Sequence, residues 1–440
     1  MANYADLTNI TDVLKNVYGE GLTNQFNDEK ITYNLFPKSD RKPGGKGYVF
    51  GIRYARAQGT GGRAESKYLP DPLTGVKDNG IINPRYIYGS IRITGPAIES
   101  AKGNTMAFVD SLSDEIEDIY QSIVVDMNRM SHWDGFGMLG RLSAAATVPA
   151  DTWLGTFDND LGVRYMQEGQ LVDFYASAGD TVPGATASAV FGQRIKSITP
   201  STNVVLFETN ATTYKATHPT LSSLTNGVAT TMATGCIAVK LGARDAAWAS
   251  TDTPVEFTGL DGIFDDGTNL AVFEGITVAS NPKWAANVVS NSSINRELSI
   301  DLMLNACDVT RTRSGRKPNK ILMGLGQRRK YANLLMPDVR FAPTVLKGGY
   351  ETLTFSGGDG SLEIIVDPMC QPNRIYFFPD DIIKKYELTP LGWGNLDGSQ
   401  LHQRASYDEW DAFLRCYTNL GVETRNCLTV LKDLVEPSLY

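Results

Sequence analysis

Residues 45–70 of the chain read GKGYVFGIRYARAQGTGGRAESKYLP. Tyr48, Phe50, Ile52 and Tyr54 alternate with smaller or charged residues, which is the period of a strand with one covered face. A second alternating run, from about Arg85 to Thr94, predicts an antiparallel partner strand. The connection between them is dense in Gly, Pro, Asp and Asn and far longer than the roughly two to five residues that usually close a hairpin. We therefore expect a long two-stranded arm, which needs a second protein surface because an isolated ribbon is marginal in water.

The arm is strongly basic. From Lys38 to Lys67 the chain has eight Lys and Arg residues against two acidic ones. Further on, from Asp110 to Asp126, it has six acidic residues and no Lys or Arg. Two solvated faces would explain both runs, since charge runs usually need no partner. Alternatively, the two surfaces are complementary, and they set register and partner choice when copies of the chain associate.

The acidic run belongs to a predicted helix from about Thr105 to Ser131. Apolar residues recur there at three- and four-residue intervals and form one continuous stripe. A helix of this length is a rod of roughly 40 Å. Its Met and aromatic positions favour packing in a core over binding of a cofactor. Gly135, Gly137 and Gly140 are expected to end it.

Short strand-like runs follow between about Gly162 and Pro282. Separated by Gly, Pro and Asn, they predict a compact antiparallel barrel or sandwich. The runs are 170–175, 195–198, 204–207 and 236–241. After Pro282 helices and strands alternate, which indicates an α/β domain. The expected elements are helices at about 292–309 and 327–335, strands at 320–324, 351–355, 362–367 and 374–378, a hairpin turn at 357–360, and a strand-rich tail at 410–431.

Composition narrows the class of protein. A chain of 440 residues with 42% hydrophobic and 20% charged residues is globular and too long for one ordinary core, so two or three substructures are expected. No apolar run approaches the roughly 20 residues that span a bilayer, and the start MANYADLTNITDVLKNVYGE lacks the pattern of a secretory signal. We expect no membrane contact and synthesis into a cytoplasm.

Cysteine usage and net charge argue against a disulfide-bonded protein, a zinc protein and a protein that binds nucleic acid tightly. The five cysteines are scattered and never form a C-x-x-C pair, which favours buried thiols over disulfides or a zinc site. A net charge of −8 argues against tight, sequence-independent binding to phosphate backbones.

An enzyme is the competing class, and its usual motifs are weak here. The three histidines, His132, His218 and His402, lack metal-ligand spacing, and no Ser or Cys lies in a nucleophile motif. Gly324 and Gly326 begin a strand-turn-helix without the third glycine of a dinucleotide site, so a tight turn is the better interpretation. The glycines at 44–47 lack phosphate-loop spacing, and the acidic turn at 261–267 lacks the ligand spacing of an EF-hand. We expect no catalytic residue, no cofactor and no metal.

The order of these elements resembles the tailed-phage major capsid protein family, whose fold is shared with herpesvirus shell proteins. The segments that carry the resemblance are residues 45–70, NRIYFFPDDIIKKYEL at 373–388 and WDAFLRCYTNLGVETRNCLTVL at 410–431. The resemblance implies an α+β fold in six segments. They are an N-terminal arm at 1–42, an extended loop formed by the long hairpin at 43–95, a peripheral domain with a spine helix at 96–161, an inserted β-rich module at 162–282, an axial α/β domain at 283–390, and C-terminal strands returning to the peripheral domain at 391–440.

The resemblance also implies a function. The chain is expected to be a homo-oligomer that forms the hexamers and pentamers of an icosahedral shell, assembles in the host cytoplasm and contacts packaged double-stranded DNA non-specifically. A scaffolding protein, a portal and decoration proteins are further expected partners. Other structural phage components, such as tail or decoration proteins, remain an alternative because they share the setting, although they are usually shorter or wholly β.

Contact residues between subunits follow from the resemblance together with the two charge runs. On the extended loop they are Arg53, Arg56, Arg63, Lys67, Tyr68 and Leu69, and on the neighbouring subunit's helix they are Glu115, Glu117 and Asp118. The glycine-rich tip, 59–80, is expected to become ordered only on assembly, with Tyr68, Leu69, Leu73 and Val76 as its apolar anchors.

Overall fold

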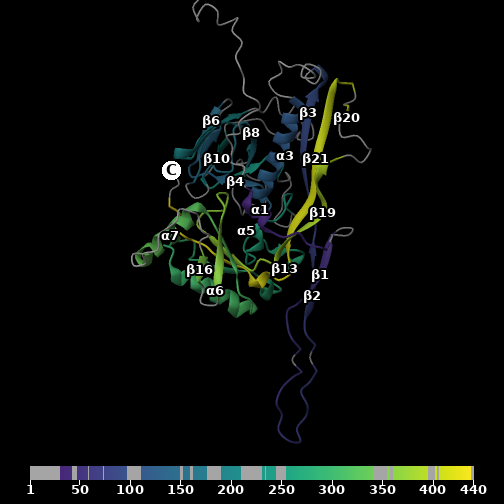
Figure 1. The fold of residues 1–440 in the computed structure, drawn as a ribbon, viewed down its shortest axis with the longest axis vertical. Helices are drawn as coiled ribbons and strands as arrows, with labels where there is room; N and C mark the ends of the chain where they lie inside the picture. Colours follow the sequence, from purple (N-terminus) through teal and green to yellow (C-terminus); the bar gives the residue numbers. More distant parts are fainter. Residues whose placement is uncertain are drawn as a thin grey trace, which may run out of the picture. The chain divides into compact units, whose positions relative to one another are not determined.

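The computed structural model describes residues 30–41, 47–57, 59–72, 74–96, 111–148, 152–158, 162–175, 190–209, 230–232, 234–243, 254–339, 354–356, 360–394, 402–403 and 406–437 (Figure 1). The described chain divides into two compact units, treated separately below. Tyr88–Val124 and Leu391–Arg415 belong to the first, and Glu29–Ile87, Val125–Pro390 and Cys416–Tyr440 to the second. None of the described helices is long and apolar enough to cross a membrane.

The basic arm is a hairpin, but its strands are not the predicted pair. β1 (Tyr48–Arg53) pairs antiparallel with β2 (Lys77–Ile82), in a register that places Phe50 opposite Gly80. The prediction that β1 pairs with the run at 85–94 is therefore wrong. Asn79 and Gly80 look like a turn in the sequence, yet Gly80 is buried under a ring, because a Cβ there would lie 2.4 Å from Cζ of Phe50.

The run at 85–94 is β3 (Arg85–Thr94), which pairs with β21 (Glu409–Val422). The same sheet has the order β19-β21-β20, with β19 at Ile383–Trp393 and β20 at His402–Gln403. In the first unit, the amide of Gly95 donates to the carbonyl of Asp408 (2.9 Å), and Arg92 Nε lies 2.6 Å from Asp411 Oδ1.

The long apolar stripe forms α3 (Ser111–Met130), so the helix is confirmed from residue 111, and 105–110 lie outside the described residues. Gly89 of β3 allows α3 to approach this strand closely, because a Cβ at residue 89 would lie 2.4 Å from Cδ1 of Ile123. The helix ends at Met130, in a turn where Ser131 bonds back to Met127. Gly135 and Gly137 follow in a loop with positive φ, so the prediction that glycines end the helix is wrong.

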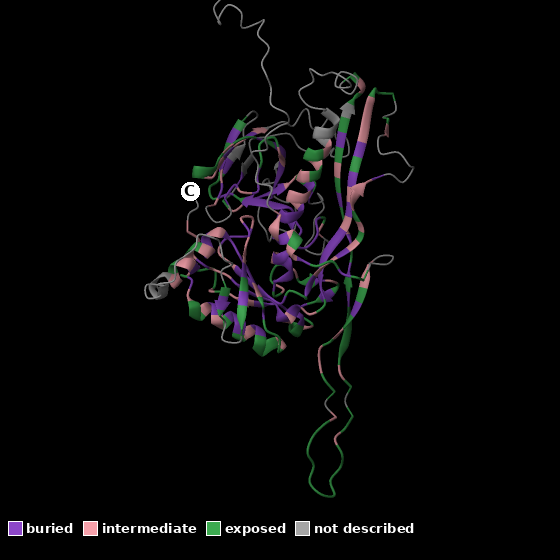
Figure 2. Ribbon diagram, viewed as in Figure 1, coloured by how far each residue is buried: buried purple, intermediate pink, exposed green. Residues whose placement is uncertain are grey.

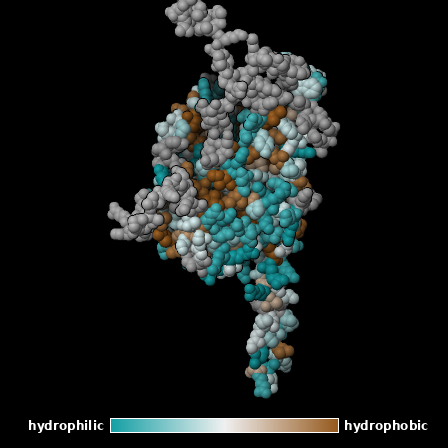
Figure 3. All heavy atoms as spheres, in the orientation of Figure 1, coloured by the Kyte–Doolittle hydropathy of each residue, from teal (hydrophilic) through white to brown (hydrophobic). Residues whose placement is uncertain are grey.

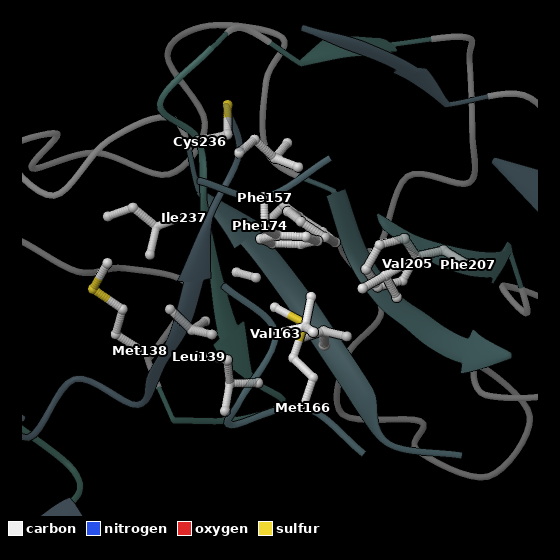
Figure 4. Close-up of a cluster of buried hydrophobic side chains, with 14 of the residues drawn as sticks. Met138, Leu139, Phe157, Val163, Met166, Phe174, Val205, Phe207, Cys236 and Ile237 are labelled. Atoms are coloured by element: carbon white, nitrogen blue, oxygen red, sulfur yellow. The ribbon is translucent and has the colours of Figure 1, made fainter. Parts of the chain in front are cut away.

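Six antiparallel strands form a barrel in the second unit. Their order is β4-β11-β7-β8-β9-β6, and a bridge between Leu142 and Phe157 joins β4 to β6 and closes the ring. The bounds are β4 Met138–Arg141, β6 Thr152–Thr156, β7 Leu171–Tyr175, β8 Val190–Thr199, β9 Val204–Thr209 and β11 Ile237–Lys240. Phe157, Phe174, Phe207 and their neighbours fill the interior (Figure 4). The barrel includes β4 and β6, although both strands precede residue 162, the expected start of the inserted module. The boundaries of the six expected segments remain a proposal.

A mixed sheet of order β14-β22-β18-β15-β17-β16 forms the α/β part of the second unit. β14 with β22 and β15 with β17 are parallel, and the other neighbours are antiparallel. The strands are β14 Asn287–Val289, β15 Lys320–Met323, β16 Thr354–Ser356, β17 Ser361–Val366, β18 Ile375–Phe378 and β22 Thr429–Leu431. Met303 and Ala306 of α6 (Ile300–Ser314) and Tyr331 of α7 (Leu325–Val339) share a buried core with this sheet.

Helix α6 begins later than the expected residue 292. Ser292 and Ser293 have positive φ and cannot start a helix there, whereas the side chain of Ser299 caps the helix by accepting from the Leu302 amide. Gly315, with φ 72°, ends it. The remaining elements are α1 Ile31–Leu35, α5 Leu260–Ile263, β5 Ala146–Val148, β10 Thr230–Met232, β12 Val272–Phe273, β13 Ile276–Thr277, and the 3-10 turns η1 Pro200–Thr202, η2 Pro282–Trp284 and η3 Arg425–Cys427.

Candidate interaction surface

The root of the hairpin is fastened by aromatic packing within the second unit. Phe50 of β1 lies 5.9 Å from Trp284 between ring centroids, and Tyr48 stacks on Tyr386 of β19 at 5.3 Å. Phe50, Trp284 and Tyr386 are buried. Because aromatic pairs contribute about 0.5–1.5 kcal/mol beyond the area they bury, this end of the hairpin is held firmly.

Glu274 adds a second attachment. It sits in the tight turn between β12 and β13 with φ 50°, where its carbonyl accepts from the Ile81 amide of β2 (2.8 Å). Its carboxyl group accepts from the Val422 amide of β21 (2.9 Å). Burial raises the pKa of this carboxyl well above its usual range, against the opposing effects of the Val422 amide and the nearby Arg425. One residue therefore ties a hairpin strand to the neighbouring sheet.

Polar contacts complete the root. Arg41 donates to the hydroxyl of Tyr48, and its Nη1 lies 3.1 Å from Glu423 Oε1. Tyr386 also reaches Glu423, at 3.3 Å. Sequence reasoning missed this anchoring set of Glu274, Trp284 and Tyr386. The Glu-Gly pair between short apolar runs at 272–277 is a hairpin-turn signal that could have pointed to Glu274.

Beyond the root the hairpin is exposed (Figure 2). Every residue from Thr60 to Leu69 is exposed, with Tyr68 at 95% and Leu69 at 83% of their full accessibility. Such exposure of large apolar side chains at the end of an extended ribbon is typical of a surface that another protein covers. In Figure 3 the hairpin is mostly hydrophilic with isolated apolar positions. Leu73, one of the expected anchors, lies outside the described residues.

The predicted cations Arg53, Arg56, Arg63 and Lys67 are all exposed. Within the described part of the chain none of them forms an ion pair, and the guanidinium of Arg63 bonds only to the carbonyl of Gly62. The structure therefore leaves these charges available to a partner.

The predicted carboxylates lie on α3 in the first unit. Glu117 and Asp118 are exposed, while the side chain of Glu115 is outside the described residues. The pairing of these carboxylates with hairpin cations of another copy remains a prediction.

The histidine that the structure buries, His132, makes a contact inside the fold. His132 Nε2 lies 3.1 Å from Asp367 Oδ2, but both side chains are fully buried. Burial raises the pKa of Asp367, but hydrogen bonds from His132 and Thr32 outweigh it and hold the pKa well below its usual range. Because this carboxylate also accepts from Asn128, the cluster joins α1 and α3 to the residue that follows β17. Of the other histidines, His218 is outside the described residues and His402 lies in β20.

Of the two glycines at the start of α7, Gly326 has a packing role. A Cβ on Gly326 would lie 2.0 Å from Oε1 of Glu436, whose other oxygen accepts from the side chain of Gln327 (2.7 Å). The chain's own carboxylate thus occupies this helix N-terminus, where anions are favoured. In the acidic turn, Asp265 accepts from the amides of Gly267 and Leu270, so it bonds to its own loop. All five cysteines are buried thiols outside any disulfide, as predicted. No cluster of metal-ligating side chains occurs among the residues that the structure describes.

The fold of this chain is similar to solved structures. No protein-family model and no curated protein matches this chain. A chain of the structure described as the cyanophage A-1(L) capsid asymmetric unit is 13% identical with a TM-score of 0.58, and the similarity covers 96% of this chain and 98% of that one. A chain from the capsid of a native GTA particle is 8% identical with a TM-score of 0.50, covering 99% and 100%. At these identities the likeness concerns the fold, and the α+β capsid fold expected from the sequence is confirmed.

Proposed function

We propose that this chain is the major capsid protein of a tailed phage and assembles into the pentamers and hexamers of an icosahedral shell around double-stranded DNA. The observation that carries the proposal is similarity along nearly the whole of both chains to a protein of the cyanophage A-1(L) capsid. Since the match covers 98% of that chain, it is not limited to one shared substructure. The chain's place is then the capsid of the virion, and its role is structural.

The hairpin supports the proposal. Its root is packed by Phe50, Trp284 and Glu274, whereas its far part presents Tyr68 and Leu69 to solvent. Burying each of these side chains on a neighbour would contribute about 1.5–3 kcal/mol. We propose that the hairpin lies on the neighbouring subunit and that Arg53, Arg56, Arg63 and Lys67 meet Glu115, Glu117 and Asp118 there.

A shell also needs parts that this chain does not supply. A scaffolding protein, a portal and decoration proteins are proposed as partners, together with DNA held non-specifically and assembly in the host cytoplasm. The proposed segments keep the boundaries 1–42, 43–95, 96–161, 162–282, 283–390 and 391–440, with the module at 162–282 as the part added to the minimal fold.

Expression of the chain alone and with its phage's scaffolding protein tests the function. Size-exclusion chromatography and negative-stain microscopy should show megadalton closed shells. A monomer that never assembles, with or without scaffold and at any ionic strength, would contradict the proposal.

The hairpin's part is tested separately by hydrogen exchange. Residues 77–80 of the expected tip are paired in β2, so the proposal of ordering on assembly applies to 59–76. We expect residues 59–76 to exchange fast in the free subunit and slowly in shells, because contact with a neighbour orders them. Slow exchange in the free subunit would show a preformed loop and would exclude ordering on assembly.

A further inference from the structure

Tertiary structure brings cations from three distant segments into one surface of the second unit. Lys283 Nζ reaches the carbonyl of Tyr54 (3.2 Å), between Arg53 and Arg56 of the hairpin. On its other side, Arg313 Nη2 lies 3.4 Å from the carbonyl of Pro282, the residue before Lys283. The hairpin root, η2 and the C-terminal end of α6 are therefore joined by contacts that involve basic side chains.

We define the cationic face as Arg53, Arg56, Lys77, Lys283, Arg313 and Arg316, all of which are exposed. Two carboxylates accompany them. Asp78 accepts from the side chain of Asn281 (3.3 Å), and Asp381 pairs with Arg316 (3.1 Å). Two further exposed carboxylates lie near by, Asp266 in a hollow shared with Pro282 and Asp380 next to Asp381. The six cations still leave this surface positive on a chain whose net charge is −8.

The contacts within one subunit do not account for the cationic face. The helix dipole favours Arg313 at the end of α6, but it does not explain Lys283 or the hairpin. Arg53 and Lys77 are directly opposite each other in the ladder, and like charges in that position destabilise a strand pair. An anionic partner lying over the ladder would remove that penalty.

We propose that the cationic face as a whole, and not the hairpin alone, is one half of a head-to-tail contact between two copies of this chain, and that the acidic side of α3 around Glu117 and Asp118 is the other half. This inference rests on the proposed function. It adds Lys283, Arg313 and Arg316, which lie outside the hairpin, to the contact.

Charge complementarity selects a second copy as the partner. Copies with a net charge of −8 repel one another, so association needs opposite charges at the point of contact. The chain carries both signs, on two different surfaces: the cationic face, and Glu117 and Asp118 of α3, which form no ion pair within the described residues. Two different complementary surfaces on one chain give a heterologous contact, the type that closes into rings.

The test reverses two charges outside the hairpin. The double variant Lys283→Glu with Arg313→Glu leaves every hairpin residue unchanged. Its matched control, Arg194→Glu with Lys196→Glu, makes the same charge change at two exposed cations of barrel strand β8. Oligomers are measured by size-exclusion chromatography with light scattering over a range of salt concentrations.

At about 50 mM salt, the protein concentration needed for half-maximal assembly should rise at least about tenfold for the double variant and less than about twofold for the control. Near 1 M salt, where screening shortens to about 3 Å, the difference should largely disappear. The neutral variant Lys283→Gln with Arg313→Gln should lie between wild type and the reversal, and it decides the question if the reversed protein fails to fold.

Rescue identifies the partner surface. A chain that also carries Glu117→Lys and Asp118→Lys places two new cations opposite the new carboxylates at 283 and 313, while the other four cations of the face keep their charge. Assembly should therefore recover in part, at a protein concentration at least about threefold below that of the double variant alone. Absence of rescue would overturn the assignment of the α3 surface.

Other outcomes separate this inference from the proposed function. If wild type never assembles, the capsid role itself fails. If wild type assembles and the double variant assembles equally well at every salt concentration, only the role of the cationic face beyond the hairpin is refuted. If the double variant forms normal shells but loses retention of a fluorescent DNA duplex, the face binds nucleic acid and the inference is overturned.

Discussion

Loss of Arg129 should destabilise the second unit strongly. This residue lies near the end of α3 with 4% of its side chain exposed, and its guanidinium contacts Glu256 (2.5 Å) and Asp126 (2.7 Å). Lys240 of the barrel strand β11 holds the other oxygen of Asp126 at 2.6 Å. Burial raises the pKa of Asp126, but Arg129 and Lys240 together outweigh this effect and bring it down to about 2. The network thus joins the helix to the barrel through charges removed from water.

Replacing Arg129 with Met removes the cation that pairs directly with Glu256 in the described part of the chain. Asp126 retains Lys240, but Glu256, which is 7% exposed, is left as an uncompensated buried acid. Removing one partner of a buried pair costs roughly 3–5 kcal/mol, and we expect a loss of this size in the unfolding free energy at neutral pH. Adding Glu256→Gln should restore roughly 2 kcal/mol, because the buried charge disappears with its partner.

The loss of stability on replacing Arg129 should depend on pH. Burial, opposed by Arg129, already raises the pKa of Glu256. Without Arg129 the folded-state pKa rises further, so the protonated form is favoured in the fold. The loss of stability should therefore be largest above that pKa and shrink as pH falls through it, since protonation of Glu256 removes the unpaired charge.

Urea unfolding of the unassembled subunit, followed by tryptophan fluorescence, measures these differences. Arg141→Met serves as the control because Arg141 is exposed on β4, and it should change stability by less than about 0.5 kcal/mol. A loss under about 1 kcal/mol for Arg129→Met, or a double variant no better than the single one, would refute the argument that an unpaired Glu256 is the cause.

Three further predictions follow from close contacts and burial. Gly80→Ala should displace the ring of Phe50, lower the unfolding free energy by about 1–3 kcal/mol and speed hydrogen exchange across 48–53 and 77–82; unchanged exchange would show that the ring adapts without cost. Gly326→Ala should push Glu436 away from the start of α7 and destabilise by a similar amount, measured by thermal unfolding, and an unchanged Tm would contradict the packing role of this glycine. Burial raises the pKa of Asp173 to about 6, so its protonated form is favoured in the fold, and stability relative to Asp173→Asn should fall by about 1–3 kcal/mol as pH rises from about 4 to above 6. A constant difference between these two proteins across that range would exclude titration of Asp173.

Local patterns predicted helices and strands whose type depends on the period of their own residues. The stripe from Thr105 to Ser131 predicted α3, and the short apolar runs predicted β7, β9, β11 and β15, because helix and strand periods depend on which face of the chain is covered. The five buried thiols and the exposed basic hairpin followed from composition and charge. These properties are determined by the sequence alone because each depends on the nearby chain and on contact with water.

Only the tertiary structure decided which strand pairs with β1. The run at 85–94 has the stronger alternation, but that alternation reflects its place beside β21, with Gly89 facing α3, and KDNGII pairs with β1 because Gly80 accommodates Phe50. Likewise, nothing local indicates that Lys283 and Arg313 lie beside the hairpin, or that Glu436 occupies the start of α7. Strand pairing and charge clustering depend on contacts between residues hundreds of positions apart, and their energies arise only when the packed core brings those residues together.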